Sequence, residues 1–459
     1  MNDLGTPDKP LRVAVVGAGP SGFYATEALI KSDLTVEVDL VERLPAPFGL
    51  VRNGVAPDHP KLKQAIGTYQ KIAQTPGFNY IGNVTLGRDI QPHELRATHH
   101  AVIYTCGAET DRRLGIEGED LPGSHTATEF VGWYNGHPDY RDRSFDLSTE
   151  TAVIIGQGNV AIDVARILAK SVDDLKHTDI AEHALDALAQ SRIKDIYVIG
   201  RRGPAQAKFT TKELREFAIL DHCRAFIDAS ELVLNPASSA EVADVKGKVA
   251  GKNLELFKQF SQTADGGQPR TCHFTFLKSP LRLEGDGRLQ RIVLEKNELS
   301  GETFAQSARG TGETSVLDCG LLFRSIGYRG IEIPGVPFHE RWGTFPNNAG
   351  RVTDGEGGDV IAGVYTAGWI KRGPSGIIGT NRACAVETVQ SLLADLDNLE
   401  TERAGASALY KILDERGIKY LDYPRWEKID AAEIKRGEPK GKPREKYTRV
   451  DEMLEVAGF

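Results

Sequence analysis

Residues 13–31 read VAVVGAGPSGFYATEALIK, and this stretch decides the fold. Its first apolar residues are typical of a buried strand, the glycines that follow are typical of a tight turn, and the remainder has the pattern of a helix. A second strand is expected at 35–42, TVEVDLVE, which completes a strand–helix–strand unit. Such a unit binds dinucleotides, because the N-terminus of the helix attracts a pyrophosphate.

Each glycine of this first loop has its own expected role. Gly17 permits the tight turn, Gly19 lets a pyrophosphate approach the backbone, and Gly22 allows the helix to pack closely on the strand. Glu42 ends the next strand about 20 residues further on, where an acid accepts hydrogen bonds from a ribose 2′-hydroxyl and repels a 2′-phosphate. The loop therefore predicts a site for FAD or NAD, the alternative being a glycine-rich turn beside a surface glutamate.

The pattern recurs at residues 153–170, VIIGQGNVAIDVARILAK. Gly156 and Gly158 occupy the first two glycine positions of this second loop. Ala161 occupies the third position, where a small side chain still permits helix–strand packing. The second loop predicts a second dinucleotide site in the same chain.

The residues after the next strand indicate which nucleotide the second site prefers. The strand expected within 195–203 leads into Arg201 and Arg202, and guanidinium groups match the geometry of a phosphate. A helical insert at 172–190 accounts for the longer distance between loop and arginines. This second site is expected to take NADP(H), the alternative being two exposed arginines at a strand end.

Composition limits the class of protein. The 459 residues are 40% hydrophobic and 26% charged, which is typical of two or three globular domains. The formal net charge of −8 argues against nucleic-acid binding, and no apolar run is long enough for a membrane span. Five dispersed cysteines without a C-x-x-C pair argue against a disulfide framework or a metal site, and favour a reducing, cytoplasmic location.

Three further segments carry expectations about local structure. A helix is expected near 61–73 and another from about 376 to 396, with Gly376 at its N-terminus. Residues 433–449 are locally basic and contain Pro439 and Pro443, which indicates a loop.

With both loops identified, the chain resembles the adrenodoxin-reductase family of ferredoxin–NADP⁺ reductases. The segments that carry the resemblance are PFGLVRNGVAPDHPK (47–61), FVGWYNGHP (130–138), GQGNVAIDVARIL (156–168), GRRGPAQAKFTTKELRE (200–216), SIGYRG (325–330) and GWIKRGPSGIIGT (368–380). The resemblance implies an α/β fold with two Rossmann-like, three-layer dinucleotide-binding domains in a glutathione-reductase-like architecture. An NADP domain, 109–324, would be inserted in a discontinuous FAD domain, 1–108 and 325–459.

The same resemblance implies an activity and its site residues. Hydride would pass from NADPH to FAD N5, and single electrons would then pass to a small iron–sulfur protein. The implied FAD contacts, which include the first loop, are Gly17, Gly19, Ser21, Gly22, Glu42, Leu50, Leu86, Trp369, Gly376, Ile377 and Ile378. The implied NADP contacts, which include the second loop, are Gly156, Gln157, Gly158, Asn159, Val160, Arg201, Arg202, Glu213 and Gly376.

Proton handling and nicotinamide positioning are implied for His59, Asp163 and Glu213, each of which has a simpler interpretation. His59 is also explained as a turn cap, Asp163 as a partner of its helix dipole, and Glu213 as part of a surface ion pair. The expected partner is a small acidic iron–sulfur protein that docks near Lys212 and Arg215, which otherwise belong to a solvated helix face.

Other functions remain open at this stage. A disulfide reductase of similar architecture needs a C-x-x-C pair, and a subunit of a fused iron–sulfur complex needs a cysteine cluster, and the chain has neither. An FAD- and NADPH-binding sensor or assembly protein without turnover, and an NADPH dehydrogenase with a different acceptor, both stay possible.

Overall fold

The computed structural model describes residues 3–459, which form two compact units. Unit 1 comprises residues 3–110, 135–138 and 328–459, and unit 2 comprises residues 111–134 and 139–327. The chain therefore passes between units after Thr110 and after Gly327, whereas the sequence placed these crossings after residues 108 and 324. Residues 135–138 belong to unit 1, although the sequence analysis assigned them to the inserted domain.

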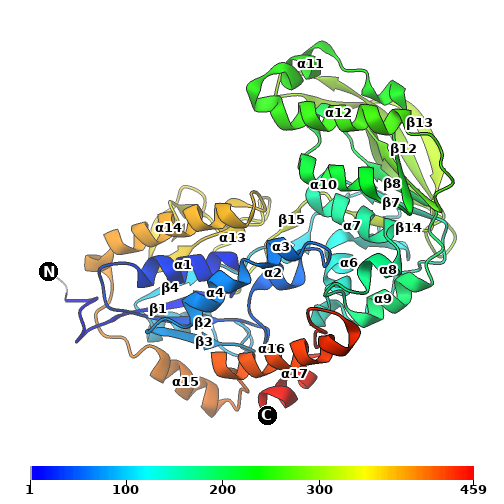
Figure 1. The fold of residues 1–459 in the computed structure, drawn as a ribbon. Coiled ribbons are helices and arrows are strands. Elements are labelled where there is room, and N and C mark those ends of the chain that lie inside the picture. The colour runs from blue at the N-terminus through cyan, green and yellow to red at the C-terminus, as the bar shows by residue number, and fades with distance from the viewer. Residues whose placement is uncertain (1–2) are drawn as a thin grey trace. The chain divides into compact units, whose positions relative to one another are not determined.

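A seven-stranded sheet with the order β16-β17-β18-β4-β1-β2-β3 forms the centre of unit 1 (Figure 1). Its strands are β1 (Leu11–Val16), β2 (Val36–Val41), β3 (Phe78–Ile81), β4 (Ala101–Tyr104), β16 (Asn347–Asn348), β17 (Arg351–Thr353) and β18 (Val360–Thr366). β1 lies between β2 and β4 and runs parallel to both. Alternate residues of β1 enter different apolar clusters, Val13 and Val15 on one face and Ala14 and Val16 on the other. The first glycine loop thus leaves the middle of a sheet that is buried on both faces.

Helices cover both faces of this sheet. They are α1 (Pro20–Ile30), α2 (Gly49–Asn53), α3 (Pro60–Lys63), α4 (Ile66–Ala73), α5 (Pro92–Thr98), α13 (Trp369–Arg372), α14 (Ile378–Ala394), α15 (Ala406–Glu415), α16 (Tyr423–Gly437) and α17 (Val450–Ala457). α1 packs against α4 and α14, while α5 and α15 contribute to the opposite cluster. The helix expected near 61–73 is interrupted between α3 and α4, and the helix expected at 376–396 begins later, at Ile378.

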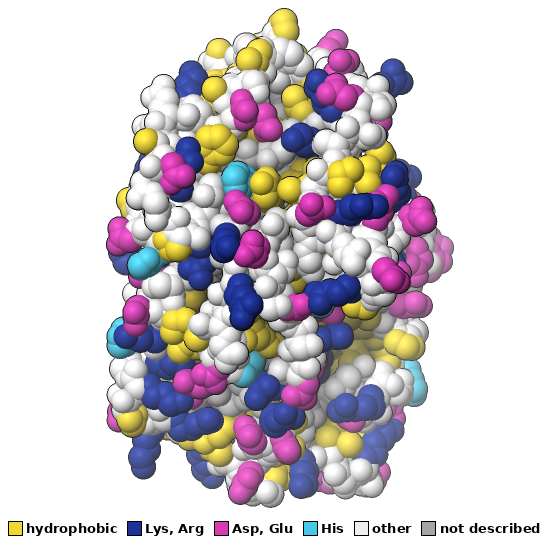
Figure 2. Space-filling view, turned by 90° about the vertical axis from the view of Figure 1, so that its right-hand side faces the viewer, with side chains coloured by type: hydrophobic (Ala, Val, Ile, Leu, Met, Phe, Trp, Pro, Cys, Tyr) yellow, Lys and Arg dark blue, Asp and Glu magenta, His cyan; other side chains and the backbone are white. Residues whose placement is uncertain are grey.

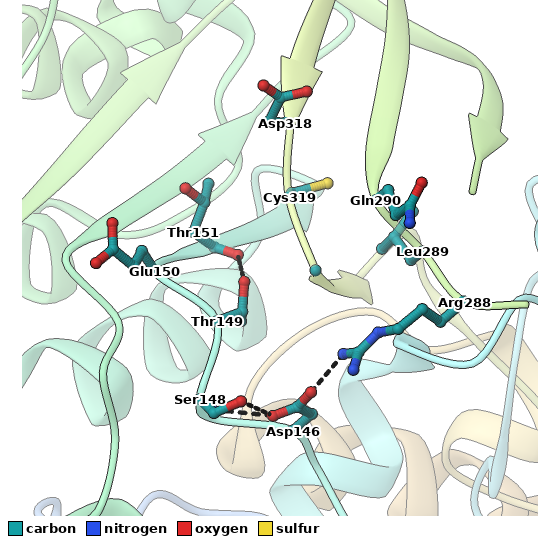
Figure 3. A pocket seen from close by; sticks show the side chains of 11 residues that line it. Asp146, Ser148, Thr149, Glu150, Thr151, Arg288, Leu289, Gln290, Asp318 and Cys319 are labelled. Carbon is teal, nitrogen blue, oxygen red and sulfur yellow. Dashed lines mark hydrogen bonds and ion pairs between the residues drawn. The ribbon is translucent and has the colours of Figure 1, made fainter. Parts of the chain in front are cut away.

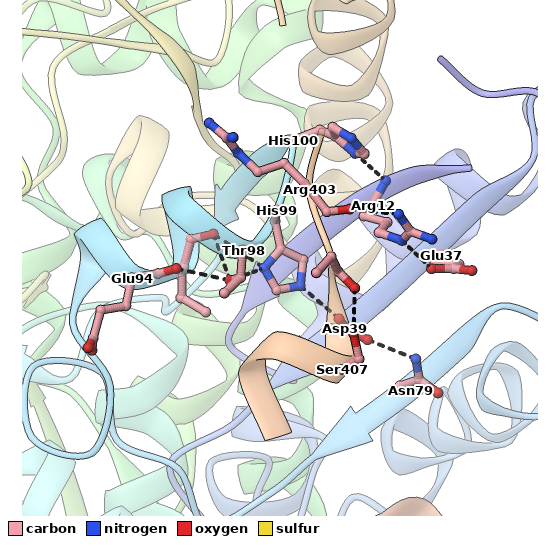
Figure 4. A network of polar contacts seen from close by, with 12 residues as sticks. Arg12, Glu37, Asp39, Asn79, Glu94, Thr98, His99, His100, Arg403 and Ser407 are labelled. Atoms are coloured by element: carbon pink, nitrogen blue, oxygen red, sulfur yellow. Dashed lines mark hydrogen bonds and ion pairs between the residues drawn. The ribbon is translucent and has the colours of Figure 1, made fainter. Parts of the chain in front are cut away.

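A polar network ties residues 401–407 to the sheet of unit 1 (Figure 4). Arg12 pairs with Glu37 at 2.8 Å and donates to the backbone carbonyl of Arg403 at 2.6 Å. The buried ring of His99 contacts Asp39 at 2.7 Å, between Nε2 and Oδ2. The Arg12 contact holds the connection between α14 and α15 against β1, and the His99 contact joins β2 to the start of β4; both roles are structural.

The C-terminal segment is folded into unit 1, and the loop expected at 433–449 is confirmed only for residues 441–449, which contain no helix or strand. α16 continues through Gly437, and the side chains of Lys442 and Lys446 are buried. Lys442 Nζ donates to Glu445 at 2.7 Å, and Lys446 Nζ donates to the backbone carbonyls of Arg52 and Asn135. The basic residues there satisfy buried acceptors, which a local charge count does not reveal.

Unit 2 is built around a parallel six-stranded sheet with the order β6-β14-β7-β8-β10-β9. Its strands are β6 (Ser124–Thr126), β7 (Thr151–Ile155), β8 (Asp195–Ile199), β9 (Cys223–Phe226), β10 (Arg270–Thr275) and β14 (Leu321–Arg324). β8 ends at Ile199, so the arginines that follow lie in a turn beyond the strand. The helices are α6 (Ala127–Tyr134), α7 (Asn159–Ala169), α8 (Val172–Leu175), α9 (Glu182–Ala189), α10 (Thr211–Glu216), α11 (Pro236–Ala243) and α12 (Lys248–Gln262).

The third layer of unit 2 is a three-stranded antiparallel sheet rather than helices. It consists of β11 (Lys278–Glu284), β12 (Arg291–Ser300) and β13 (Ser307–Asp318). Leu283, Ile292 and Leu294 pack against Val153 and Leu322 of the central sheet. The helical insert expected at 172–190 is present as α8 and α9. Within residues 3–459, no helix is both long enough and apolar enough to span a bilayer.

Candidate functional sites in the two units

The first glycine loop has the backbone conformation that its sequence requires. Gly17 has a φ of +108°, and a Cβ there would lie 2.7 Å from the carbonyl oxygen of Thr105. A Cβ at Gly22 would lie 2.0 Å from the carbonyl oxygen of Gly17. At Gly19, by contrast, a Cβ would meet no atom within 4 Å. Gly17 and Gly22 are thus required for the turn, while Gly19 leaves open space in front of the loop.

The N-terminus of α1 faces this space without a side-chain cap. Gly19 is the N-cap residue and Pro20 occupies the first turn, but no side chain accepts from the amides that follow. Uncapped amides at a helix N-terminus favour a bound anion. Ser21 is buried, and its hydroxyl contacts Asn381 of α14 at 3.1 Å.

Glu42 follows β2 and holds the first loop directly. Its Oε2 accepts from the backbone amide of Ala18 at 2.8 Å, and its Oε1 accepts from that of Leu44 at 3.1 Å. Burial raises the pKa of Glu42, and the two amide hydrogen bonds oppose that shift. Each carboxylate oxygen keeps a second lone pair that can accept from a ribose hydroxyl.

The PFGL segment lies against the first loop. Phe48 donates its amide to the carbonyl of Ala18 at 2.8 Å, and Phe48 itself has a φ of +84°. A Cβ added to Gly49 would lie 3.0 Å from the Cα of Gly19, so the two glycines approach closely. Leu50, the next residue, has 38% of its surface exposed at this place.

The late segment of unit 1 places further predicted contacts at the ends of two helices. Trp369 begins α13, lies 5.4 Å from the ring of Tyr328, and donates its indole N–H to Ser375. Gly376, with a φ of +84°, precedes the N-cap residue Ile377, so the helix starts two residues later than expected. The side chain of Ile377 is 69% exposed.

These observations fit a bound FAD in unit 1. An uncapped helix terminus, open space at Gly19 and the exposed apolar side chains of Leu50 and Ile377 are what a pyrophosphate with an apolar ring system requires. Leu86 is half-buried and packs against the apolar cluster on one face of the sheet. Whether each named residue contacts FAD remains a prediction.

The second glycine loop repeats this geometry in unit 2. Gly156 has a φ of +139°, and a Cβ there would lie 2.1 Å from the carbonyl of Ser325. A Cβ at Gly158, the N-cap residue of α7, would meet no atom within 4 Å. Ala161 is fully buried, so its methyl group is part of the helix–sheet contact. These features fit a second dinucleotide.

Two side chains of the second loop have structural partners. Gln157 donates from Nε2 to the carbonyl of Val198 at 3.1 Å. Asn159 accepts from the amide of Thr210 at 2.9 Å, and the carbonyl of Gln157 accepts from the amide of Lys208 at 2.8 Å. The segment before α10 is therefore attached to the loop. Val160 is half-buried in the first turn of α7.

Arg201 and Arg202 lie directly after β8, Arg201 exposed and Arg202 half-buried. Arg202 has an acidic neighbour that the sequence analysis missed, the buried Glu241 of α11. Burial by itself raises the pKa of Glu241, but hydrogen bonds from Gln306 and Gln206 and the charge of Arg202 lower it overall. No local motif marks Glu241, because its partners are distant in the sequence.

A buried arginine brings together two of the predicted catalytic residues. Arg166 of α7 is fully buried and contacts Asp163 at 2.8 Å, Glu213 at 3.4 Å and Glu216 at 3.2 Å. Glu213 is itself buried, so the surface ion pair considered for it is wrong. Asp163 is held by Arg166 rather than only by the helix dipole. The sequence analysis overlooked Arg166, although its spacing of three residues from Asp163 is a recognisable helical pair.

His59 belongs to unit 1, at the N-cap position of α3. Its side chain is buried, and its backbone amide donates to the carbonyl of Ala56 at 3.0 Å. Its ring makes no capping hydrogen bond to α3, while the interpretation of the ring as a turn cap or as the partner of a backbone carbonyl stays a prediction.

An open depression of about 370 Å³ in unit 2 lies away from the second loop (Figure 3). Its lining includes Ser148, Thr151, Arg288 and Cys319. Thr151 is the first residue of β7, whereas the loop follows the last residue of that strand. Parallel sheets bind nucleotides at the carboxyl ends of their strands, so this depression is a different feature from the dinucleotide site.

Comparisons with known proteins place the chain in a family. No family model matches it. It is 43% identical to the mitochondrial NADPH:adrenodoxin oxidoreductase of Arabidopsis thaliana, with 98% of this chain and 96% of the relative covered. It is equally 43% identical to the NADPH-ferredoxin reductase FprA of Mycobacterium tuberculosis, with 98% and 99% covered.

Solved structures agree with these relatives. The structure described as Mycobacterium tuberculosis FprA in complex with NADPH matches with a TM-score of 0.92 and 43% identity, covering 98% of this chain and all of that chain. The two-domain dinucleotide-binding fold is thereby confirmed. By sequence and by fold, the chain belongs to the adrenodoxin-reductase family of NADPH–ferredoxin reductases.

Proposed function

We propose that this chain is a flavoprotein oxidoreductase that transfers electrons from NADPH to a small iron–sulfur protein, with FAD in unit 1 and NADPH in unit 2. FAD, when bound, supplies the conversion of a two-electron donor's hydride into single electrons. The redox chemistry belongs to the cofactors, so the protein has to bind them, orient them and place suitable charges beside them.

The observation that carries this proposal is the opposite charge beside two otherwise similar glycine loops. Glu42 lies beside the first loop and accepts from its Ala18 amide, which suits a ribose diol and disfavours a 2′-phosphate. Arg201 and Arg202 follow β8 beside the second loop, which suits the 2′-phosphate of NADPH. One site suited to a ribose diol and one suited to a 2′-phosphate, in the same chain, support electron transfer between NADPH and a flavin.

The remaining residues have proposed roles at the two sites. In unit 1, the amides of α1 bind the pyrophosphate, and Leu50 and Ile377 exclude water from the ring system. In unit 2, Arg166 holds the carboxylates of Asp163 and Glu213 in fixed positions, where they would orient the nicotinamide. We keep His59 as a candidate for proton handling on the family resemblance.

Anaerobic mixing with NADPH tests the proposal. The purified protein is expected to carry a flavin absorbance band that bleaches rapidly on mixing. Reduction of cytochrome c should then require added ferredoxin or adrenodoxin. A protein whose flavin band does not bleach is a sensor or assembly protein, and one that reduces cytochrome c equally well without an iron–sulfur protein has a different acceptor.

The proposed docking surface for the iron–sulfur protein is α10. Lys212 and Arg215 are both exposed on this helix. Figure 2 shows basic and acidic side chains interspersed over one face of the molecule, so the net charge of −8 does not make every part of the surface acidic. Local positive charge speeds the transient docking of an acidic partner. A cytoplasmic location would suit five free cysteines.

A further inference from the structure

The turn that carries Arg201 and Arg202 is held from outside through its backbone carbonyls. The carbonyl of Gly200 accepts from the amide of Lys278 at 3.1 Å, and the carbonyl of Arg202 accepts from the amide of Leu277 at 3.1 Å. The carbonyl of Arg201 accepts from the side chain of Asn297, at 2.8 Å from Nδ2. Three consecutive carbonyls are therefore bound by two other segments of the chain, residues 277–278 and Asn297 of β12.

Asn297 lies beside an irregularity in the pairing of β12 with β13. The register shifts between Glu295 and Asn297, because one β12 residue, Lys296, stands opposite residues 311–313 of β13. The side chain of Asn297 is only 4% exposed. Its second amide hydrogen is directed to Ser279 Oγ at 2.8 Å. Both hydrogens are thus committed, and the amide orientation is set, because the carbonyl of Arg201 can only accept.

The backbone of Asn297 supports the second connection as well. Its amide donates to the carbonyl of Leu277 at 2.7 Å, and Leu277 has a φ of +54°, which is unusual for a residue other than glycine. Such a conformation persists only where its surroundings hold it. Leu277 in turn donates to Arg202, so Asn297 acts on both arginines, directly on one and through Leu277 on the other.

We propose that Asn297 is a positioning residue for nucleotide choice: by fixing the turn of Arg201 and Arg202, it sets the preference for NADPH over NADH. This inference rests on the proposed NADPH site in unit 2. An arginine loses conformational freedom when it binds a phosphate, and this loss weakens binding. A backbone turn that is already fixed before binding reduces the loss. Asn297 itself touches only the protein, so its effect should appear in discrimination between nucleotides and not in the rate of the chemical step.

Asn297→Leu tests the proposal, because leucine has a similar size and donates no hydrogen bond. The KM for NADPH is expected to rise roughly three- to tenfold, the fold-change that corresponds to one lost hydrogen bond. The KM for NADH and both kcat values should stay within about twofold of the parent protein. Binding of 2′,5′-ADP should weaken by the same factor as NADPH, while binding of 5′-AMP should not change. Asn297→Ser provides a second variant if the leucine protein does not fold.

The matched control is Thr311→Val in β13, which removes a hydrogen bond of 2.9 Å to the carbonyl of Lys296 at the same irregularity of the β12–β13 pairing. This variant perturbs the sheet but not the turn, so both KM values should remain at parent levels. Equal weakening of NADPH and NADH in the Asn297 variants, or no change in either, overturns the inference.

A third protein separates this inference from the proposed function. Arg201→Gln combined with Arg202→Gln should abolish the preference for NADPH. If it does not, the proposed NADPH site is wrong. If it does while the Asn297 variants keep the parent preference, only the role of Asn297 is refuted.

Discussion

Replacing Glu433 with glutamine should destabilise unit 1 strongly, because Glu433 is the centre of a buried ion-pair network. Its carboxylate receives Arg52 of α2 at 2.5 and 2.9 Å, and it also accepts from the amide of Tyr447 at 3.0 Å. Glu433 is fully buried and Arg52 is 4% exposed. Arg444 contacts the same carboxylate at 3.4 Å.

The magnitude follows from the burial of both partners. Removing one charge of a buried pair leaves the other uncompensated, which costs about 3–5 kcal/mol, whereas an exposed pair contributes about 0–1 kcal/mol. Arg52 would lose the carboxylate charge and keep a neutral hydrogen bond to the glutamine oxygen, besides its contact with the ring of Trp426 at 5.1 Å. For a unit of this size the loss corresponds to a fall in Tm of roughly 6–20 °C.

Differential scanning calorimetry of the holoprotein measures this loss, with Glu427→Gln as the control. Glu427 is exposed on the same helix, so its replacement should leave Tm within about 1 °C. The double variant Arg52→Met, Glu433→Leu should recover most of the lost stability, because it leaves no buried charge unpaired. A double variant as unstable as the sum of its single variants would refute the reasoning. Because α2 carries Leu50, Glu433→Gln should also retain less FAD during dialysis.

Three other outcomes are expected. Gly22→Ala should yield a protein with little bound FAD, since the new methyl would lie 2.0 Å from the carbonyl oxygen of Gly17. The control, Gly67→Ala, has no atom within 4 Å of its added Cβ and should bind FAD normally. The ratio of flavin absorbance to protein absorbance measures the bound FAD in both variants. His183→Gln should flatten the acid side of the stability–pH curve. Burial, and after it the charge of Arg141, lowers the pKa of His183 to about 4. The contribution of neutral His183 to stability is therefore fully present above its unfolded pKa of about 6.5 and is lost as the pH falls through 4. Urea titrations at several pH values measure the free energy of unfolding, and an equal dependence of that free energy on pH in both proteins would contradict the prediction. Neutralising the two exposed basic residues of α10 should raise the KM for an acidic iron–sulfur protein several-fold at low salt and little at high salt, without changing flavin bleaching by NADPH; salt-independent kinetics would exclude α10 as the docking surface.

The sequence by itself determined the two dinucleotide-binding units and their charge preferences. The roles of Gly17 and Gly156 could be predicted, because a strand, a tight turn and a helix each leave a pattern in neighbouring residues. Glu42 and Arg201 could be predicted because each follows the first strand after its glycine loop. The family resemblance rested on contiguous segments of the same kind.

Only the tertiary structure decided which charged and polar residues are buried, and against what. Arg166 reaches Glu213, and Asn297 reaches the carbonyl of Arg201, over separations that leave no periodic pattern. The basic C-terminal segment looked like a solvated loop, yet Lys446 is buried. A lysine or an asparagine looks the same in a sequence whether water or a backbone carbonyl receives its hydrogen bonds, because the partner is supplied by chain folding and not by neighbouring residues.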